Sequence, residues 1–265
     1  MTTMAAALSR CDRLGIGAGG LRLPGPRVNL WVGTIVVLVL AMVGLLAPWI
    51  APYDFNYIDW DATLKGPSSS HPFGTDDFGR DLLSRVIYGA RIDLLVGFLC
   101  AICPLVIGIG IGIGTLPVAW SRWVDRVVRL DADADVLLPL VVVPAIFVWG
   151  PSLIVFVAVL SLVGWMPYAR LTRMPALKAP KRRVAACLVF ALSDMLLAML
   201  LHMALSFLGL GVPPPAGGLG VMLLEGWTAS TWWPATFPLL AILFVVFGLS
   251  MFADGLAARF GLRQR

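Results

Sequence analysis

The sequence predicts an all-α polytopic membrane protein that crosses the bilayer six times. Of its 265 residues, 59% are hydrophobic and only 13% are charged, whereas about 25% of the residues of a soluble domain are charged. Even a soluble fold of about 300 residues buries only about 75% of the surface that its unfolded chain exposes, so the main solvent of this chain must be lipid. The same composition excludes a disordered chain, which needs low hydrophobicity and high charge.

Long stretches without charged residues indicate where the spans lie, because a bilayer core needs about 20 apolar residues of helix. A first span is expected within 28–53, and a second begins near Leu94 and ends near Pro117. The stretch 136–169 is too long for one helix, and Gly150-Pro151 is a turn signal near its middle. It therefore predicts two short helices in a hairpin, with a re-entrant hairpin as the alternative. The last two spans are expected within 184–211 and 236–257.

The positions of the basic residues predict the orientation, because Lys and Arg collect in cytoplasmic segments. Sixteen of the 20 basic residues fall in alternate segments, at 10–27, 122–129, 170–183 and 259–265. Both termini are therefore expected in the cytoplasm, and 136–169 must cross an even number of times. The predicted divisions are a cytoplasmic tail (1–27), a first transmembrane helix (28–53), an external loop with an amphipathic helix (54–93), a five-helix core (94–257) and a cytoplasmic tail (258–265).

Catalytic motifs are absent from the sequence. It contains no phosphate-binding G-x-x-x-x-G-K-[ST], no H-E-x-x-H and no G-x-S-x-G. We expect neither a catalytic residue nor a cofactor or metal, and any ATP hydrolysis must occur on another chain. The glycines that alternate from Gly108 to Gly114 have small-xxx-small spacing, which predicts close helix packing rather than a phosphate loop.

Two ionisable residues inside one predicted span support a rival function. Asp194 and His202 lie about 12 Å apart along a helix, and ionisable groups in the membrane are functional candidates by default. A proton-coupled secondary transporter would use them as a relay. The structural alternative places Asp194 within reach of Arg182, Arg183 or water and has His202 bonding a neighbouring helix. A non-transporting membrane scaffold is a third possibility.

Two segments outside the spans carry further signals. In the external segment 71–85, Thr75 or Asp76 is suited to cap a helix, and Asp81 with Arg85 has the spacing of an ion pair along it. The segment predicts an amphipathic helix at the outer surface. A second segment carries six basic residues and no acidic ones, which fits either lipid headgroups or a cytoplasmic partner. These residues are Arg170, Arg173, Lys178, Lys181, Arg182 and Arg183.

Short sequence motifs between about residues 71 and 256 resemble those of the C-type permease subunit of dipeptide and oligopeptide ABC importers (DppC/OppC-like), and they occur in the same order as in that family. The two specific blocks are His71-Pro-Phe-Gly-Thr-Asp-Asp-Phe-Gly-Arg-Asp81 and Leu205-Ser-Phe-Leu-Gly-Leu-Gly-Val212. Supporting blocks are Tyr88-Gly-Ala-Arg91, Trp123-Val-Asp-Arg126, Gly150-Pro-Ser-Leu153, Gly164-Trp165, Tyr168-Ala-Arg170, Pro214-Pro215 and Phe252-Ala-Asp-Gly-Leu256.

The resemblance implies a type I ABC importer permease of the plasma (inner) membrane. It would form a heterodimer with a homologous B-type permease, with two cytoplasmic ATPases and an external solute-binding protein as further partners, and would not bind nucleic acid. The external motif is then Gly74, Thr75, Asp76, Gly79, Arg80 and Asp81, the six basic residues form the ATPase-coupling loop, and the pathway or packing candidates are Ser161, Ser206, Phe207, Gly209 and Gly211.

One departure from the family concerns the coupling element between spans four and five. Members of the family normally carry a glutamate-alanine-alanine stretch followed by a glycine there, whereas this chain has only the basic run and Val184-Ala185-Ala186. The coupling element is therefore expected to be shortened, with the partner permease carrying more of the coupling.

Overall fold

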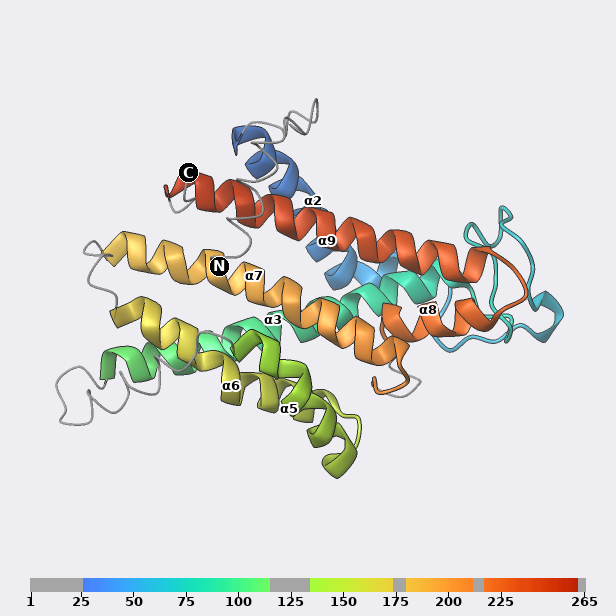
Figure 1. Cartoon of the computed structure of the whole chain (residues 1–265). Coiled ribbons are helices and arrows are strands. Elements are labelled where there is room, and N and C mark those ends of the chain that lie inside the picture. The colour runs from blue at the N-terminus through green and yellow to red at the C-terminus, as the bar shows by residue number, and fades with distance from the viewer. Residues whose placement is uncertain (1–25, 115–133, 174–179, 212–216, 262–265) are drawn as a thin grey trace, which may run out of the picture.

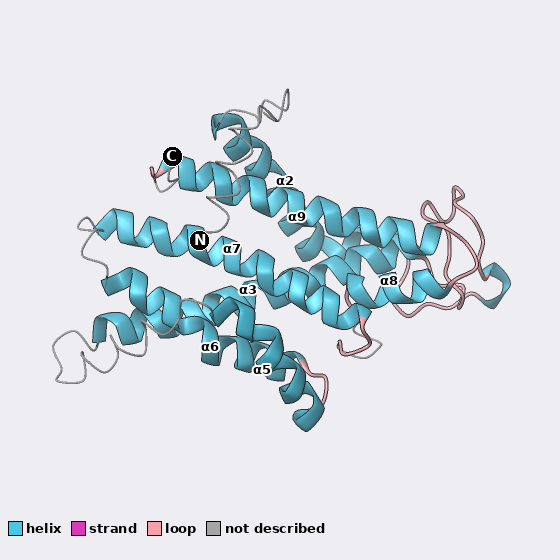
Figure 2. Cartoon of the chain, in the orientation of Figure 1, coloured by secondary structure: helices cyan, strands magenta, loops and turns pink. Residues whose placement is uncertain are grey.

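The structure is a computed structural model, which describes residues 26–114, 134–173, 180–211 and 217–261. Its framework is helical, and the described part of the chain contains no strand (Figure 2). The predicted all-α class is therefore confirmed. The elements are α2 (Pro26–Ile50), η1 (Trp60–Ala62), α3 (Leu82–Gly114), α5 (Ala134–Trp149), α6 (Leu153–Arg173), α7 (Pro180–Phe207), α8 (Leu219–Thr228) and α9 (Trp233–Arg259).

Five of the described helices, α2, α3, α6, α7 and α9, are long and apolar enough to cross a membrane. The sixth expected span corresponds to α5, which has only 16 residues. At about 1.5 Å per residue it is about 24 Å long, less than the roughly 30 Å of a bilayer core. The polytopic membrane architecture is confirmed, while the number six holds only if this short helix is included.

The ambiguous stretch 136–169 forms a helical hairpin, as expected. The chain reverses at Gly150, which has φ +85° and donates its N–H to the Ile146 carbonyl at 2.8 Å, and α5 packs against α6 (Figure 1). Arg173, at the end of α6, donates from Nε to the Gly112 carbonyl of α3 at 3.2 Å. The chain thus returns to the end of the bundle at which α3 finished, as an even number of crossings requires.

Two expectations about helices are corrected. The external amphipathic helix is not a separate element, because α3 begins at Leu82 and runs without interruption to Gly114. The apolar residues that suggested a surface helix, Leu82, Leu83, Val86 and Ile87, instead lie in the first turns of the helix that forms the second span. The second correction is α8, a helix of ten residues that was not predicted. It is too short to span, and a short apolar run does not distinguish a helix from a strand.

Helices α3 and α7 lie in the middle of the bundle, with α2 and α9 on one side and α5 and α6 on the other (Figure 1). One apolar cluster joins the central pair to α2, α8 and α9 through residues such as Val86, Met199 and Leu249. A second joins it to α5 and α6 through residues such as Val96 and Phe156. Every long helix therefore shares a core with α3 or α7.

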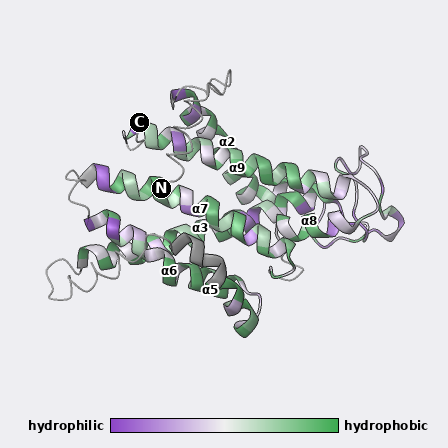
Figure 3. Cartoon of the chain, in the orientation of Figure 1, coloured by the Kyte–Doolittle hydropathy of each residue, from purple (hydrophilic) through white to green (hydrophobic). Residues whose placement is uncertain are grey.

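The long helices are apolar along most of their length (Figure 3), and many of their large apolar side chains are exposed on the surface of the bundle. On α2 an exposed stripe repeats every three or four residues, which is the spacing of one helix face. In water so large an apolar face would be unstable, so it is suited to lipid or to another membrane helix. The stripe consists of Trp31, Ile35, Leu38, Met42, Leu45 and Trp49, which are 57–78% exposed.

Glycines set the closest helix contacts. Gly108 and Gly112 of α3 face α6, where a Cβ at Gly108 would lie 2.6 Å from the Tyr168 side chain and one at Gly112 would lie 3.1 Å from Ala169. The packing interpretation of these glycines is therefore confirmed for one small-xxx-small pair. It does not extend to Gly110, which has nothing within 4 Å of its Cβ position.

We expect Gly33→Ala to separate α2 from α9 and to destabilise the protein by about 1–3 kcal/mol, the usual cost of overpacking. A Cβ at Gly33 would lie 2.5 Å from the Cα of Phe252, a backbone atom that cannot rotate away. Gly44→Ala on the same helix is the matched control, because its Cβ would meet the flexible Leu94 side chain at 3.4 Å. Thermal unfolding in detergent checks both variants, and equal midpoints would contradict the prediction.

Candidate functional site

The external loop folds around a tight turn that begins at Asp76. Its Oδ1 accepts the backbone N–H groups of Phe78 and Arg80, both at 2.9 Å, and its carbonyl accepts the N–H of Gly79 at 3.0 Å. Gly79 has φ +72°, and a Cβ there would collide with a carbonyl of the preceding loop. Gly74 is also in the left-handed region, at φ +77°. Both glycines of the external motif are therefore required by the backbone.

Two carboxylates and two arginines meet beside this turn, and we call Asp76, Arg80, Arg85 and Glu225 the external ion-pair cluster. Asp76 Oδ2 accepts from Arg80 Nε at 2.7 Å and from Arg85 Nη1 at 2.6 Å. Glu225, from α8, accepts at Oε2 from Arg85 Nη1 at 2.7 Å and from Arg80 Nη2 at 3.2 Å. Asp76 therefore binds arginines, which corrects its expected role as a helix cap, and the cluster links the loop to α3 and α8.

The shielding of the cluster makes its members depend on one another. The side chains of Asp76 and Arg85 are only 6% and 3% exposed, so the removal of one would leave a buried charge without its partner. A cavity of about 250 Å³ opens beside the cluster and is also lined by Asp77, Phe78 and Thr228. The guanidinium carbon of Arg80 lies 4.7 Å from the centre of the Phe78 ring.

Asp81 caps the start of α3. Its Oδ2 accepts the N–H of Ser84 at 2.8 Å and the hydroxyl of Ser84 at 2.7 Å, and its Oδ1 lies 3.0 Å from His71 Nδ1. The expected ion pair between Asp81 and Arg85 is therefore wrong. Capping turns the Asp81 carboxylate toward the helix end, while Arg85 extends to the external ion-pair cluster.

The loop is also fastened to α9. Thr75, the other expected helix cap, is fully buried and accepts the Lys65 N–H at 2.9 Å, so its hydroxyl holds the loop together instead. Trp233 of α9 donates from Nε1 to the Thr75 carbonyl at 3.2 Å. Phe73 stacks on Phe237 with 4.2 Å between ring centroids. The motif thus packs against the adjacent ends of α3, α8 and α9.

A second polar group lies deeper in the bundle. Asp93 of α3 is completely buried, and its Oδ1 lies 2.9 Å from Nδ1 of His202 on α7. Its Oδ2 accepts the N–H of Leu219, the first residue of α8, at 2.9 Å. Asp93 was assigned to the external loop from the sequence, and the structure corrects this. The expectation that His202 bonds a neighbouring helix is confirmed.

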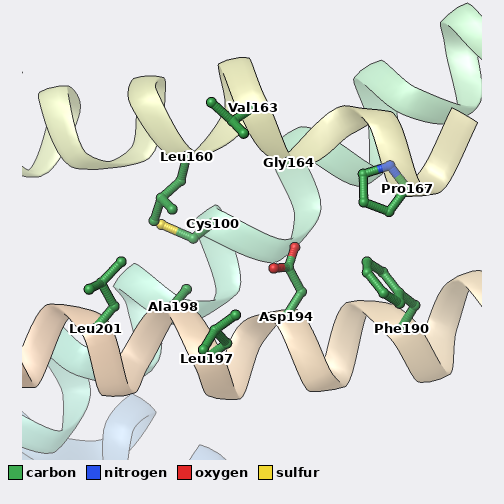
Figure 4. A pocket seen from close by; sticks show the side chains of 10 residues that line it. All are labelled: Cys100, Leu160, Val163, Gly164, Pro167, Phe190, Asp194, Leu197, Ala198 and Leu201. Carbon is green, nitrogen blue, oxygen red and sulfur yellow. The ribbon is translucent and has the colours of Figure 1, made fainter. Parts of the chain in front are cut away.

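Asp194 lies on the same helix as His202 but in another setting. It accepts a hydrogen bond from the Tyr168 hydroxyl of α6 at 2.9 Å. Its carboxylate points into a small cavity between α3, α6 and α7, which Cys100 and Phe190 also line (Figure 4). The volume, about 10 Å³, suits a single water. Asp194 and His202 therefore bond different helices.

The comparisons with known proteins agree with this architecture. The model of the N-terminal transmembrane domain of oligopeptide transport permease C matches residues 30–67. The chain is 34% identical over 259 residues to the Dipeptide transport system permease protein DppC of Escherichia coli K12, covering 85% of this chain and 86% of that protein. It is 33% identical over 260 residues to the Di/tripeptide transport system permease protein DppC of Pseudomonas aeruginosa UCBPP-PA14, covering 84% of both chains.

The chain belongs to the DppC/OppC-like family of ABC transport permeases. The permease carries most of its described basic residues at the end of the bundle where α2 begins and α6 and α9 end, on the left of Figure 1; we call this the basic end. Arg170 and Arg173 lie in the last turn of α6, and Arg182 and Arg183 lie in the first turn of α7.

The segment between α6 and α7 of the permease is short. Only residues 174–179, which include Lys178, separate the two helices and lie outside the described residues, as does the side chain of Lys181. Ala185 and Ala186, which occupy the place of the family's coupling stretch, are buried inside α7. The described basic residues of this region therefore belong to the ends of two long helices.

The pathway or packing candidates of the permease fall into two groups. Ser161 is buried on α6 without a hydrogen-bond partner for its hydroxyl. The other four end α7: Phe207 is its last residue, and Gly209 follows with φ +79° in a helix-ending turn. Ser206 is fully buried, and a Cβ at Gly211 would lie 2.6 Å from its Cα. Within this chain, Ser206 and Gly211 thus pack against each other.

Asp93 and Glu225 were missed as site residues by sequence reasoning. Glu225 is the single glutamate of the permease and follows the short apolar run 219–224, which was a usable signal. Asp93 directly precedes the uncharged stretch that begins at Leu94. A span that began earlier would have placed Asp93 inside the membrane, where a carboxylate requires a partner.

Proposed function

We propose that this permease forms, with a homologous B-type permease, the membrane pathway of an ATP-driven importer of di- and oligopeptides. An external solute-binding protein would deliver the peptide, and two cytoplasmic ATPases would supply the energy. The observation that carries the proposal is 33–34% identity over about 84–86% of two permeases that are named for dipeptide and di/tripeptide transport. The intact external motif and the long apolar helices support it further.

The proposed orientation places the basic end in the cytoplasm and the external ion-pair cluster outside. Arg27, Arg170, Arg182 and Arg259 all lie at helix termini of the basic end, as the positive-inside rule requires. On this basis we assign both termini, with the tails 1–27 and 258–265, to the cytoplasm. The ATPases then dock on the cytoplasmic side, and the binding protein docks on the outer side. The chain is then a multi-pass protein of the inner membrane, and it needs no catalytic residue of its own.

Within the basic end, the region where α6 ends and α7 begins is the proposed ATPase-coupling surface. Arg182 is exposed at the positive end of the α7 dipole, where a cation is unfavourable. An acidic partner surface would offset the charge of Arg182 and the positive end of the helix dipole. This supports docking of an ATPase there. Because the sequence lacks the family's glutamate-alanine-alanine stretch at this place, we propose that the B-type permease carries the larger share of the coupling. The residues assigned to this surface are Arg170, Arg173, Lys178, Lys181, Arg182 and Arg183.

We expect peptide-stimulated ATP hydrolysis when this permease is reconstituted with a B-type permease, the two ATPases and the binding protein, and its loss when this chain is omitted. Arg182→Gln should weaken ATPase docking by up to about fivefold, because an exposed ion pair contributes at most about 1 kcal/mol. Arg91→Gln, an exposed arginine on α3 that lies far from the basic end, is the matched control. Peptide uptake that stops with the proton gradient and ignores the ATPases would contradict the proposal.

Two other functions have less support. A proton-coupled transporter would use Asp194 and His202 as a relay, yet each bonds a different helix, through Tyr168 and Asp93 respectively. A non-transporting scaffold would fit the shortened coupling segment. The external motif that the chain shares with transport permeases is nevertheless intact, and its charged residues form the external ion-pair cluster. The reconstitution separates both from an ATP-driven permease.

A further inference from the structure

We infer that a groove at the basic end binds the phosphate headgroup of an anionic phospholipid. The groove encloses about 410 Å³ between the start of α2 and the end of α9. Its polar side chains are two arginines, Arg27 and Arg259, and the rest of its lining is Leu30, Trp31, Gly255 and Ala258. None of these residues is among the six assigned to the ATPase-coupling surface.

The charges of the groove lack an anion within the described chain. Arg27 and Arg259 are both exposed and form no ion pair or hydrogen bond in the part of the chain that the structure describes. Two guanidinium groups that line one cavity repel each other, and an anion between them relieves that repulsion. Asp254, the acidic residue nearest to Arg259 in the sequence, does not line the groove. Arginine is suited to phosphate because its planar fork donates two parallel hydrogen bonds.

The surroundings favour a lipid over a soluble anion. Trp31 lines the groove and is 70% exposed, and Trp is typical of the headgroup level of a membrane. From it the exposed side chains of Ile35, Leu38 and Met42 continue along the same face of α2 into the membrane. A phospholipid would therefore find two cations at the level of its phosphate and an apolar track for an acyl chain below.

The two walls of the groove are held in place because the backbones of α2 and α9 are in contact beside it. A Cβ at Gly255 would lie 2.5 Å from the Cα of Leu30, so α2 and α9 touch at this point without side chains between them. The helices are held together one turn inside the groove, while Arg27 and Arg259 lie at their ends. The site is thus built by the fold, and basic pockets between transmembrane helices are known to accept anionic headgroups.

Titration of the purified full-length permease, with any subunits that co-purify, against phosphatidylglycerol tests the inference by native mass spectrometry. We expect phosphatidylglycerol to bind more tightly than phosphatidylcholine. Arg27→Gln and Arg259→Gln should each weaken it by about fivefold, and the double variant by about 25-fold. Ala258→Phe fills the groove and leaves both charges in place, so it should also weaken binding.

Arg182→Gln is the matched control, because Arg182 is exposed at the same end but does not line the groove. An equal loss in this variant would show diffuse surface attraction and would overturn the inference. Displacement of the lipid by millimolar inorganic phosphate would also overturn it, since the site would then bind a soluble anion. The inference uses the proposed orientation only to assign the lipid to the inner leaflet. The permease can therefore bind the lipid even if the proposed peptide transport is wrong. It can equally transport peptides if it proves not to bind the lipid, so the two failures are distinguishable.

Discussion

Replacement of Asp93 by alanine is expected to destabilise the permease by about 3–5 kcal/mol, the usual cost of breaking a buried polar pair by removing one partner. Asp93 is completely buried and joins α3 to both α7 and α8. Its loss leaves Nδ1 of His202 and the N–H of Leu219 without partners. Because His202 Nε2 already has no partner, the ring would then lack every hydrogen bond. Thermal unfolding in detergent measures the effect.

Two further variants make the Asp93 prediction specific. Asp93→Asn keeps one acceptor oxygen and should lose less stability than Asp93→Ala. Asp254→Ala removes an exposed carboxylate from α9 and should change the free energy of unfolding by no more than about 0.5 kcal/mol. If Asp93→Ala melted with Asp254→Ala and the wild type, Asp93 would not connect the three helices.

Replacement of Asp76 by alanine is expected to detach the external loop, again at a cost of about 3–5 kcal/mol. The Asp76 carboxylate accepts four hydrogen bonds, two from backbone N–H groups of the turn and two from the side chains of Arg80 and Arg85. Without it, the almost fully buried Arg85 retains only Glu225 as an ion-pair partner. Peptide uptake should fall, and trypsin should cleave more rapidly after Lys65 in the loop.

The neighbouring Asp77 provides the matched control for this second prediction. Asp77 is exposed and lines the same cavity, but it does not belong to the external ion-pair cluster. Asp77→Ala should leave both the melting midpoint and the cleavage rate near those of the wild type. If the two variants changed the melting midpoint and the cleavage rate equally, the stability of the loop would depend on the negative charge beside the cavity. The hydrogen bonds of Asp76 would then not be its cause.

The helices that span the membrane could be predicted largely from local sequence. The hairpin with its break at Gly150, the apolar α7 and the packing of Gly108 and Gly112 were all predicted, because length, hydropathy and turn residues act over a few residues. The start of α3 was predicted 12 residues too late, at Leu94 instead of Leu82. Its first three turns carry charged residues, two of which, Arg85 and Asp93, bond Glu225 of α8 and His202 of α7.

The candidate site was predictable only in part. The motif from Gly74 to Asp81 was identified, and the backbone explains its glycines. The roles of its charged residues were wrong, because an ion pair along one helix was the only pairing that sequence spacing could suggest for Arg85. The actual partner, Glu225, lies 140 residues away.

The sequence by itself determined that this chain is a polytopic membrane protein, because hydropathy and charge are summed over segments and need no knowledge of their neighbours. The permease family was indicated only by the resemblance of its motif blocks. The tertiary structure alone decided which polar groups meet. Asp93 finds His202 and the start of α8, and Arg85 finds Asp76 and Glu225, only once α3, α7 and α8 are packed side by side. Away from water, a buried charge needs a partner within the protein, and packing determines which one is within reach.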